Sequence, residues 1–137
     1  MANNTHLPKD VTLCNLEDLD DRQSIELTVE ERQLFAVRRD DVIFAYWNIC
    51  PHRGSPLNWA PNQFLDFDNE RIQCSLHGAL FEIDSGLCIA GPCSGDRLQP
   101  AELGCKDQSY YVAAGQKLPP IPINLRALAL ADLEDRE

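Results

Sequence analysis

Short segments with the pattern of β-strands, separated by turn-forming residues, constrain the fold of this chain more than any other feature. Residues 24–30 alternate strictly between apolar and polar side chains, which is the pattern of a strand with one buried face. Similar short segments recur along the chain, at 11–15, 33–39, 42–47, 64–67, 71–74, 79–83, 87–90, 102–106 and 110–114. Because such regular spacing is typical of all-β proteins, we predict an antiparallel β-sandwich or barrel.

The length and charge of the chain exclude several classes of protein. Its 137 residues are enough for one globular domain. Asp and Glu number 22 against 12 for Lys and Arg, a net charge of −10, so we expect no nucleic-acid partner. The sequence has no signal-like N-terminus and no apolar run of about 20 residues, and we therefore predict a cytoplasmic protein without a membrane contact.

A change of composition after Gly115 marks a predicted boundary, because the prolines that follow cannot continue a strand. We divide the chain into an N-terminal arm at 1–10, a β domain at 11–115, and a Pro-rich linker with a C-terminal helix or tail at 116–137. Asn124 can cap that helix, and several leucines after it fall on one side. Two interpretations stay open: a helix that docks on the domain or joins two copies in a homodimer, and a frayed acidic tail.

Two of the three histidines stand beside a cysteine in loops that follow strand-like segments. One residue separates Cys50 from His52, and two residues separate Cys74 from His77. Two thiolates and two imidazoles can hold either tetrahedral zinc or a two-iron cluster, so the residue types alone do not decide. Zinc fingers, however, usually pair Cys with Cys and His with His. Mixed pairs suit a two-iron cluster in which each loop gives a Cys to one iron and a His to the other.

The segments 50–57 (CPHRGSPL) and 74–81 (CSLHGALF), together with Gly91 and Pro92, closely resemble the Rieske [2Fe-2S] proteins. The resemblance covers about residues 11–114 and implies a cluster-binding subdomain of two loops, closed by a third loop that contains proline. It implies one [2Fe-2S] cluster per chain. The implied ligands are Cys50 and Cys74 for the inner iron, and His52 and His77 for the outer iron.

Further residues beside the ligands are implied to surround the cluster, since glycine lets the backbone approach closely. They are Gly54, Ser55, Gly78 and Ala79, whose N–H groups would bond sulfur, and Pro92 in the third loop. Rieske proteins of respiratory complexes carry a disulfide and two hydroxyl donors at positions that are Ser55, Leu76, Ala79 and Phe81 here. Because those donors are missing, we predict a potential near the low end of the roughly −150 to +300 mV Rieske range.

The remaining cysteines and aromatic residues are predicted to be structural. We expect Cys14 and Cys105 to be small buried side chains, and Cys88 and Cys93 to be free thiols. The aromatic side chains near the loops are expected to pack rather than to relay electrons. These are Tyr46, Trp47 and Trp59.

The resemblance implies a one-electron carrier: a stand-alone Rieske ferredoxin that passes electrons from a reductase to an oxygenase or similar acceptor. We do not predict an enzyme, because the mononuclear iron of an oxygenase needs two more His, and only His6 is left. The chain has no GxGxxG motif with which to hold its own dinucleotide. Two alternatives stay open: an accessory subunit like the small subunit of assimilatory nitrite reductase, and a structural zinc module or redox sensor.

Overall fold

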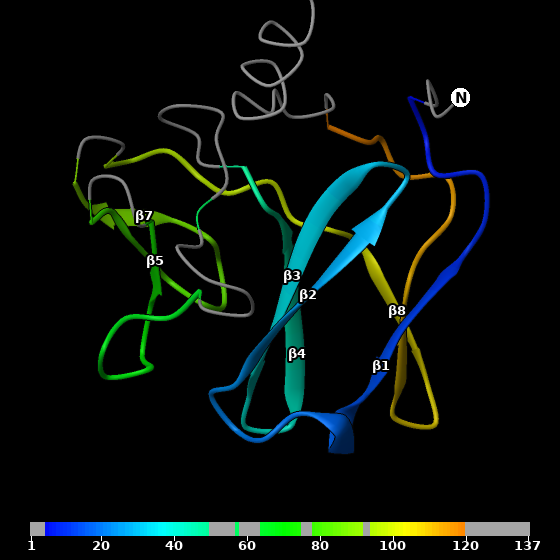
Figure 1. The fold of residues 1–137 in the computed structure, drawn as a ribbon, viewed down its shortest axis with the longest axis horizontal. Helices are drawn as coiled ribbons and strands as arrows, with labels where there is room; N and C mark the ends of the chain where they lie inside the picture. Colours follow the sequence, from blue (N-terminus) through cyan, green and yellow to red (C-terminus); the bar gives the residue numbers. More distant parts are fainter. Residues whose placement is uncertain (1–4, 50–56, 58–63, 75–77, 92–93, 120–137) are drawn as a thin grey trace, which may run out of the picture.

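The computed structural model of the protein describes residues 5–49, 57, 64–74, 78–91 and 94–119 (Figure 1). The strands in these residues are β1 (Val11–Asn15), β2 (Ser24–Val29), β3 (Arg32–Arg39), β4 (Val42–Trp47), β5 (Ile72–Gln73), β6 (Leu80–Phe81), β7 (Cys88–Ala90), β8 (Leu103–Lys106) and β9 (Ser109–Val112). A 3-10 helix, η1 (Leu16–Asp18), follows β1. The all-β prediction is confirmed. The predicted C-terminal helix lies outside the described residues, among which no helix is long and apolar enough to span a membrane.

The strands form three antiparallel sheets of three strands each, in the orders β1-β9-β8, β2-β3-β4 and β5-β6-β7. The middle sheet is a meander in which β3 pairs with both β2 and β4. Two-residue turns connect its strands, and positive φ angles at Glu30, Glu31 and Asp40 fit the left-handed geometry of such turns. In Figure 1 the β5-β6-β7 sheet lies on one side of this meander and the β1-β9-β8 sheet on the other.

Each face of the β2-β3-β4 sheet packs against a core of its own. The site-side core, shared with the β5-β6-β7 sheet, comprises Phe35, Val37, Tyr46, Leu57, Phe64, Ile72, Cys74, Ala79, Phe81, Ile83, Cys88 and Leu98. The base core, shared with the β1-β9-β8 sheet, comprises Leu7, Cys14, Leu16, Leu19, Val29, Leu34, Ala36, Ile43, Ala45, Trp47, Ala101, Val112 and Leu118. Successive residues of β3 alternate between the two cores, because side chains along a strand point to opposite faces. The predicted packing role of Tyr46 and Trp47 is confirmed; Trp59 lies outside the described residues.

The predicted strand at 64–67 is reduced to a single bridged residue in the structure, and a turn follows it. Leu65 makes an isolated bridge to Ile72, and the chain then reverses. The reversal begins at Asp66, whose carboxylate accepts the N–H groups of Glu70 and Arg71 at 2.9 and 3.2 Å. A side chain that bonds its own backbone in this way favours a turn over a strand.

Residues on both sides of the predicted 11–115 domain pack against it. The N–H of Leu7 donates to the carbonyl of Gln116 at 2.9 Å, and the N–H of Leu118 donates to the carbonyl of Thr5 at 2.8 Å. Leu7 and Leu118 are both buried in the base core. The packed unit therefore includes residues 5–7 and 116–118 as well.

A buried thiol and a buried phenol predict how the stability of the fold changes at alkaline pH. Burial, reinforced by Asp18, raises the pKa of Cys14 from 9.0 to about 11. Burial, reinforced by Asp84, raises the pKa of Tyr46 from 10.0 to about 12. The unfolded chain therefore loses these protons first, so stability should fall as the pH rises from about 9 to about 12, by on the order of 1 kcal/mol for each group after solvent screening.

Urea unfolding at a series of pH values measures this effect. Cys14→Val and Tyr46→Phe should each remove about half of the alkaline loss and leave the slope below pH 8 unchanged. If neither variant alters the alkaline slope, the two groups do not carry it.

Candidate metal centre

The first ligand loop is closed at its base by a buried amide. Asn48 directly follows β4 and is only 1% exposed. Its side-chain Oδ1 accepts the N–H of Leu57 at 2.7 Å, and Leu57 itself is fully buried in the site-side core. Residues 50–56, which include the predicted ligands Cys50 and His52 and the predicted cluster contacts Gly54 and Ser55, lie outside the described residues. The described residues on the two sides of segment 50–56 are therefore joined by a hydrogen bond and fixed to the β domain.

The second ligand loop is closed by two backbone hydrogen bonds around Cys74. The N–H of Cys74 donates to the carbonyl of Ala79 at 2.8 Å, and the N–H of Gly78 donates to the carbonyl of Cys74 at 2.9 Å. Gly78 has a φ of +66°, which lets the chain turn back within this short span. The N–H of Gly78 that we predicted to bond a sulfur is thus engaged within the loop. His77 lies outside the described residues.

The third loop leaves β7 at Gly91 and lies directly against the second. The N–H of Gly95 donates to the carbonyl of Cys88, and the N–H of Cys88 donates to the carbonyl of Asp96, at 3.0 and 2.8 Å. Gly91 has a φ of +101°, and a Cβ placed on it would lie 2.8 Å from the Cα of Ala79. Only glycine allows the two backbones to approach this closely. Pro92 lies outside the described residues.

The residues at which the three loops leave the β domain, which we call the loop bases, meet in the site-side core. Their side chains suit a metal cluster. Cys74 is 1% exposed and forms no disulfide, so it offers a thiol, the soft ligand that iron–sulfur clusters use. Leu57, Cys74 and Ala79 belong to the same core, which brings the end of the first loop to the second. The described residues contain no group of three or more His, Cys, Asp and Glu side chains, and three of the four predicted ligands lie outside them. The donor set of two Cys and two His fits a [2Fe-2S] cluster.

The remaining cysteines differ from one another. Cys14 is buried, as predicted, but the prediction for Cys105 is wrong, because this side chain is exposed. It lies on β8, an edge strand whose burial decreases from Leu103 toward Lys106. Cys88 is buried and its Sγ–H donates to the carbonyl of Ala90 at 3.2 Å. Cys93 lies outside the described residues, so its predicted free state stays a prediction.

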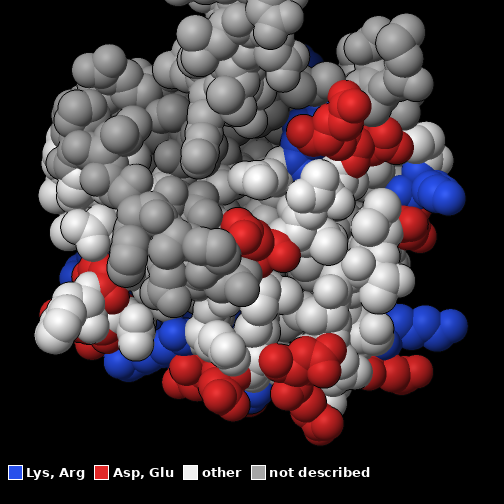
Figure 2. Space-filling view, in the orientation of Figure 1, with Lys and Arg blue, Asp and Glu red and all other residues white. Residues whose placement is uncertain are grey.

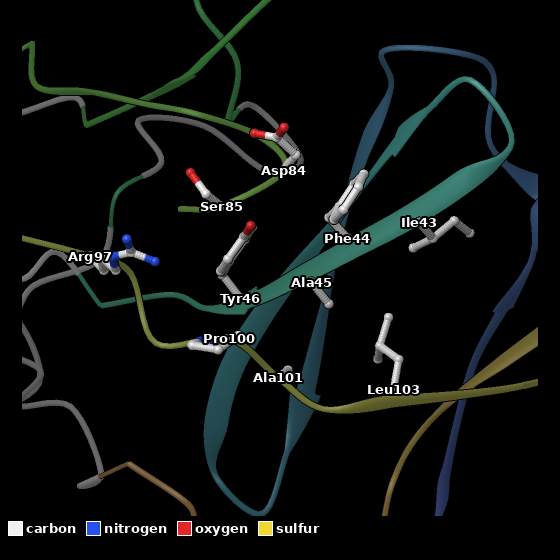
Figure 3. A pocket seen from close by; sticks show the side chains of 10 residues that line it. All are labelled: Ile43, Phe44, Ala45, Tyr46, Asp84, Ser85, Arg97, Pro100, Ala101 and Leu103. Carbon is white, nitrogen blue, oxygen red and sulfur yellow. The ribbon is translucent and has the colours of Figure 1, made fainter. Parts of the chain in front are cut away.

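A groove of about 500 Å³ runs along β4 and is separate from the loop bases (Figure 3). Ile43, Ala45 and Leu103 make one end of it apolar, while Asp84 and Arg97 lie at the other. The hydroxyl of Tyr46, which also lines it, donates to the carbonyl of Ile83 at 2.6 Å. Cys74, the predicted ligand within the described residues, does not line this groove.

Figure 2 shows acidic side chains near the upper right and at the centre of the view, and a further group at the end of the molecule that carries η1. This further group follows the lower edge of the view, where Figure 1 shows η1 and the turns that precede β4 and follow β8. The N–H of Asp40 donates to the carboxylate of Asp21 at 2.7 Å, and the N–H of Leu16 donates to the carbonyl of Gln108 at 2.8 Å, so these turns are adjacent. β4 runs from this end to Asn48, a length of about 17 Å at strand rise.

The residues that close the loops were not found by sequence reasoning. Asn48 carried no signal beyond being an isolated amide between an apolar strand and a loop. The approach of Gly91 to Ala79 continues the pairing of β6 with β7, in which Leu80 lies opposite Ala90; the sequence indicates the two strands but not how closely their backbones meet there. The predicted residues Gly78 and Ala79 do lie beside Cys74.

Comparison with known proteins identifies the family to which this architecture belongs. Residues 9–113 match the Rieske [2Fe-2S] domain family. Cholesterol 7-desaturase of Caenorhabditis elegans is 30% identical over 81 residues, which are 58% of this chain and 18% of that protein. Apoptosis-inducing factor 3 of Mus musculus is 29% identical over 77 residues, or 56% of this chain and 12% of that protein. The chain thus spans less than a fifth of these two relatives.

Solved structures share the fold. The ferredoxin of carbazole 1,9a-dioxygenase from Nocardioides aromaticivorans IC177 superposes with a TM-score of 0.62 and 22% identity, covering 77% of this chain and 98% of that one. The terminal oxygenase of the same system gives a TM-score of 0.64 and 16% identity, covering 84% of this chain and 33% of that one. With the family match spanning most of the sequence, the chain belongs to the Rieske [2Fe-2S] domain family, whose cofactor is a Rieske-type [2Fe-2S] cluster.

Proposed function

We propose that this protein is a one-electron carrier, a Rieske ferredoxin that takes electrons from a reductase and passes them to an oxygenase or similar acceptor protein. The extent of the structural likeness supports this most: it covers 98% of a ferredoxin chain but 33% of a terminal oxygenase chain. When bound, the cluster accepts and releases a single electron. The protein then has to hold the cluster rigidly and present it to partners.

The ligand set that we propose is Cys50 and Cys74 for the inner iron, and His52 and His77 for the outer iron. Cys74 is suited to the inner position, because its side chain is buried and the backbone on both sides of it is hydrogen-bonded. Gly54, Ser55, Ala79 and Pro92 are the proposed neighbours of the cluster. Gly78 shapes the second loop through its bond to the carbonyl of Cys74.

The described residues also support a carrier rather than an enzyme with its own substrate site. The groove of about 500 Å³ along β4 has one acidic and one basic side chain at one end, and the described residues contain no group of three or more metal-ligating side chains. The acidic surplus of the sequence, a net charge of −10, can steer encounters with basic partners over a distance. We place the protein in a reducing compartment on the basis of its thiols.

Metal analysis and spectroscopy of the protein purified without air test this function. We expect two irons and two sulfides per chain, a rhombic electron paramagnetic resonance (EPR) signal after dithionite, and uptake of one electron per chain in a reductive titration. The midpoint potential should lie near the low end of the Rieske range of roughly −150 to +300 mV. One zinc per chain, no visible colour and no reversible electron uptake would overturn the proposal in favour of a structural zinc module.

Histidine variants provide the matched control. His52→Ala should abolish the rhombic signal, because an iron ligand is lost. His6→Ala should leave the signal unchanged, because His6 is exposed and its ring contacts only the hydroxyl of the adjacent Thr5, at 3.1 Å, among the hydrogen bonds of the described residues. Equal signals in both variants would contradict the proposed ligand set.

A further inference from the structure

We propose that Asn48 is a positioning residue that fixes the two ends of the first ligand loop and so controls how tightly the cluster is held. The proposal rests on the ligand set above, in which that loop supplies Cys50 and His52. It concerns a side chain that is not one of the proposed ligands and that acts through the backbone of the loop.

The hydrogen bonds of Asn48 join three segments of the chain. Its Oδ1 accepts the N–H of Leu57 at 2.7 Å, across the loop. Its own N–H donates to the carbonyl of Gln33 on β3 at 2.8 Å, and its Nδ2 donates to the side-chain Oε1 of Gln33 at 3.3 Å. One amide therefore ties both ends of the loop to the middle sheet.

The backbone around Asn48 is held equally firmly. The N–H of Trp47 donates to the carbonyl of Gln99 at 3.0 Å, and the N–H of Ile49 donates to the carbonyl of Trp47 at 2.8 Å, which turns the chain sharply as the loop begins. At the other end, Leu57 is fully buried in the site-side core, to which Cys74 also belongs. We call the hydrogen bonds that join Asn48 to Leu57 and to Gln33 the clamp.

Burial explains why an amide suits this position. Asn48 is 1% exposed, so an unsatisfied N–H at Leu57 could not turn to water if the amide were lost. The amide also supplies an acceptor and a donor together, without placing a charge two residues from an iron ligand. A carboxylate would keep the acceptor but would add negative charge there.

Two substitutions separate the geometry of the clamp from its charge. Asn48→Leu keeps the branched shape of the side chain but removes the acceptor for Leu57. We expect the cluster to be lost about 10- to 100-fold faster, the range by which metal affinity falls when groups that support the metal ligands are removed. Asn48→Asp keeps that acceptor, and the amide of Gln33 can turn over to donate to the second oxygen. The Asp variant should hold the cluster nearly as well as the native protein, but at a lower midpoint potential, because negative charge disfavours the added electron.

Gln116→Leu is the matched control for a general loss of stability. Gln116 is also a buried amide, 5% exposed, and bonds the backbone of Glu102 and Ala113 far from the ligand loops in the chain. Its loss should lower the urea midpoint without accelerating cluster loss in native buffer.

Gln33→Leu is a milder test of the clamp, to be used if Asn48→Leu does not fold. Gln33 lies at an exposed position, and we expect its substitution to accelerate cluster loss a few-fold.

The measurements are the decay of cluster absorbance in air, the redox potential, the EPR spectrum, and hydrogen exchange of the peptide containing Leu57. Faster exchange at Leu57 together with faster cluster loss in Asn48→Leu, and rescue of both in Asn48→Asp, would support the clamp. If Asn48→Leu loses its cluster no faster than Gln116→Leu, the clamp is refuted while the carrier function stands. If the native protein holds no iron, the proposed function itself fails.

Discussion

Gly91→Ala is expected to separate the second and third loops and to lower cluster occupancy sharply. The new Cβ would lie 2.8 Å from the Cα and 3.0 Å from the Cβ of Ala79, and a backbone atom cannot move aside as a flexible side chain can. The φ of +101° adds strain for any residue with a side chain. Together these effects should cost about 2 to 5 kcal/mol. Because the carbonyl of Ala79 accepts the N–H of Cys74, displacement of Ala79 would disturb a proposed ligand directly.

Urea unfolding and iron content per chain measure this effect. Gly95→Ala is the matched control, because Gly95 lies in the same loop at a φ of +95° with nothing within 4 Å of the added Cβ. It should cost only about 1 kcal/mol and keep the iron. Ala79→Gly introduced together with Gly91→Ala should recover part of the loss, since it removes one of the two close contacts. Equal effects of the Gly91 and Gly95 substitutions would show that the contact between the loops is unimportant.

The strands could be predicted because each carries its own local signal. Val11–Asn15 and Val42–Trp47 were predicted to the residue, and the alternation of 24–30 correctly indicated β2. Strands that depend on distant partners were predicted less well. The segment at 79–83 shrinks to Leu80–Phe81 because the chain turns again from Glu82, whose carbonyl accepts the N–H of Gly86.

The predicted ligands of the candidate site could be recognised in the sequence, but the contacts that hold their loops in place could not. The spacing of Cys and His needs no tertiary contact to be recognised, and neither does the left-handed turn at Gly86. The hydrogen bond from Leu57 to Asn48 depends instead on a contact across a loop that no local pattern predicts. The close approach of Gly91 to Ala79 continues the pairing of β6 with β7, so the sequence conceals only how tight that approach is. Cys105 was misjudged for the same reason, since a strand-like segment does not reveal that its strand lies at an edge.

The Gly86→Ala variant should unfold more easily than the native protein. Gly86 ends the turn between β6 and β7 and lies against Tyr46 of the middle sheet. A Cβ on Gly86 would lie 2.7 Å from the ring of Tyr46 and 3.3 Å from the Cβ of Leu98. That ring cannot swing away readily, because it is 3% exposed and its hydroxyl donates to the carbonyl of Ile83 at 2.6 Å. The φ of +71° adds the left-handed penalty. We expect a loss of about 2 to 5 kcal/mol in the free energy of unfolding.

A double-mutant cycle separates the two causes of this loss. Gly115 has a φ of +86° and nothing within 4 Å of an added Cβ, so Gly115→Ala should show the left-handed penalty alone, about 1 kcal/mol. Tyr46→Leu removes the ring that the added methyl group would strike, and in that background Gly86→Ala should cost no more than Gly115→Ala does. If the cost of Gly86→Ala is the same with and without the Tyr46 ring, crowding plays no part and backbone strain accounts for the whole effect. Crowding against Tyr46 predicts instead a coupling of at least about 1 kcal/mol between the two positions, read from urea midpoints at pH 7.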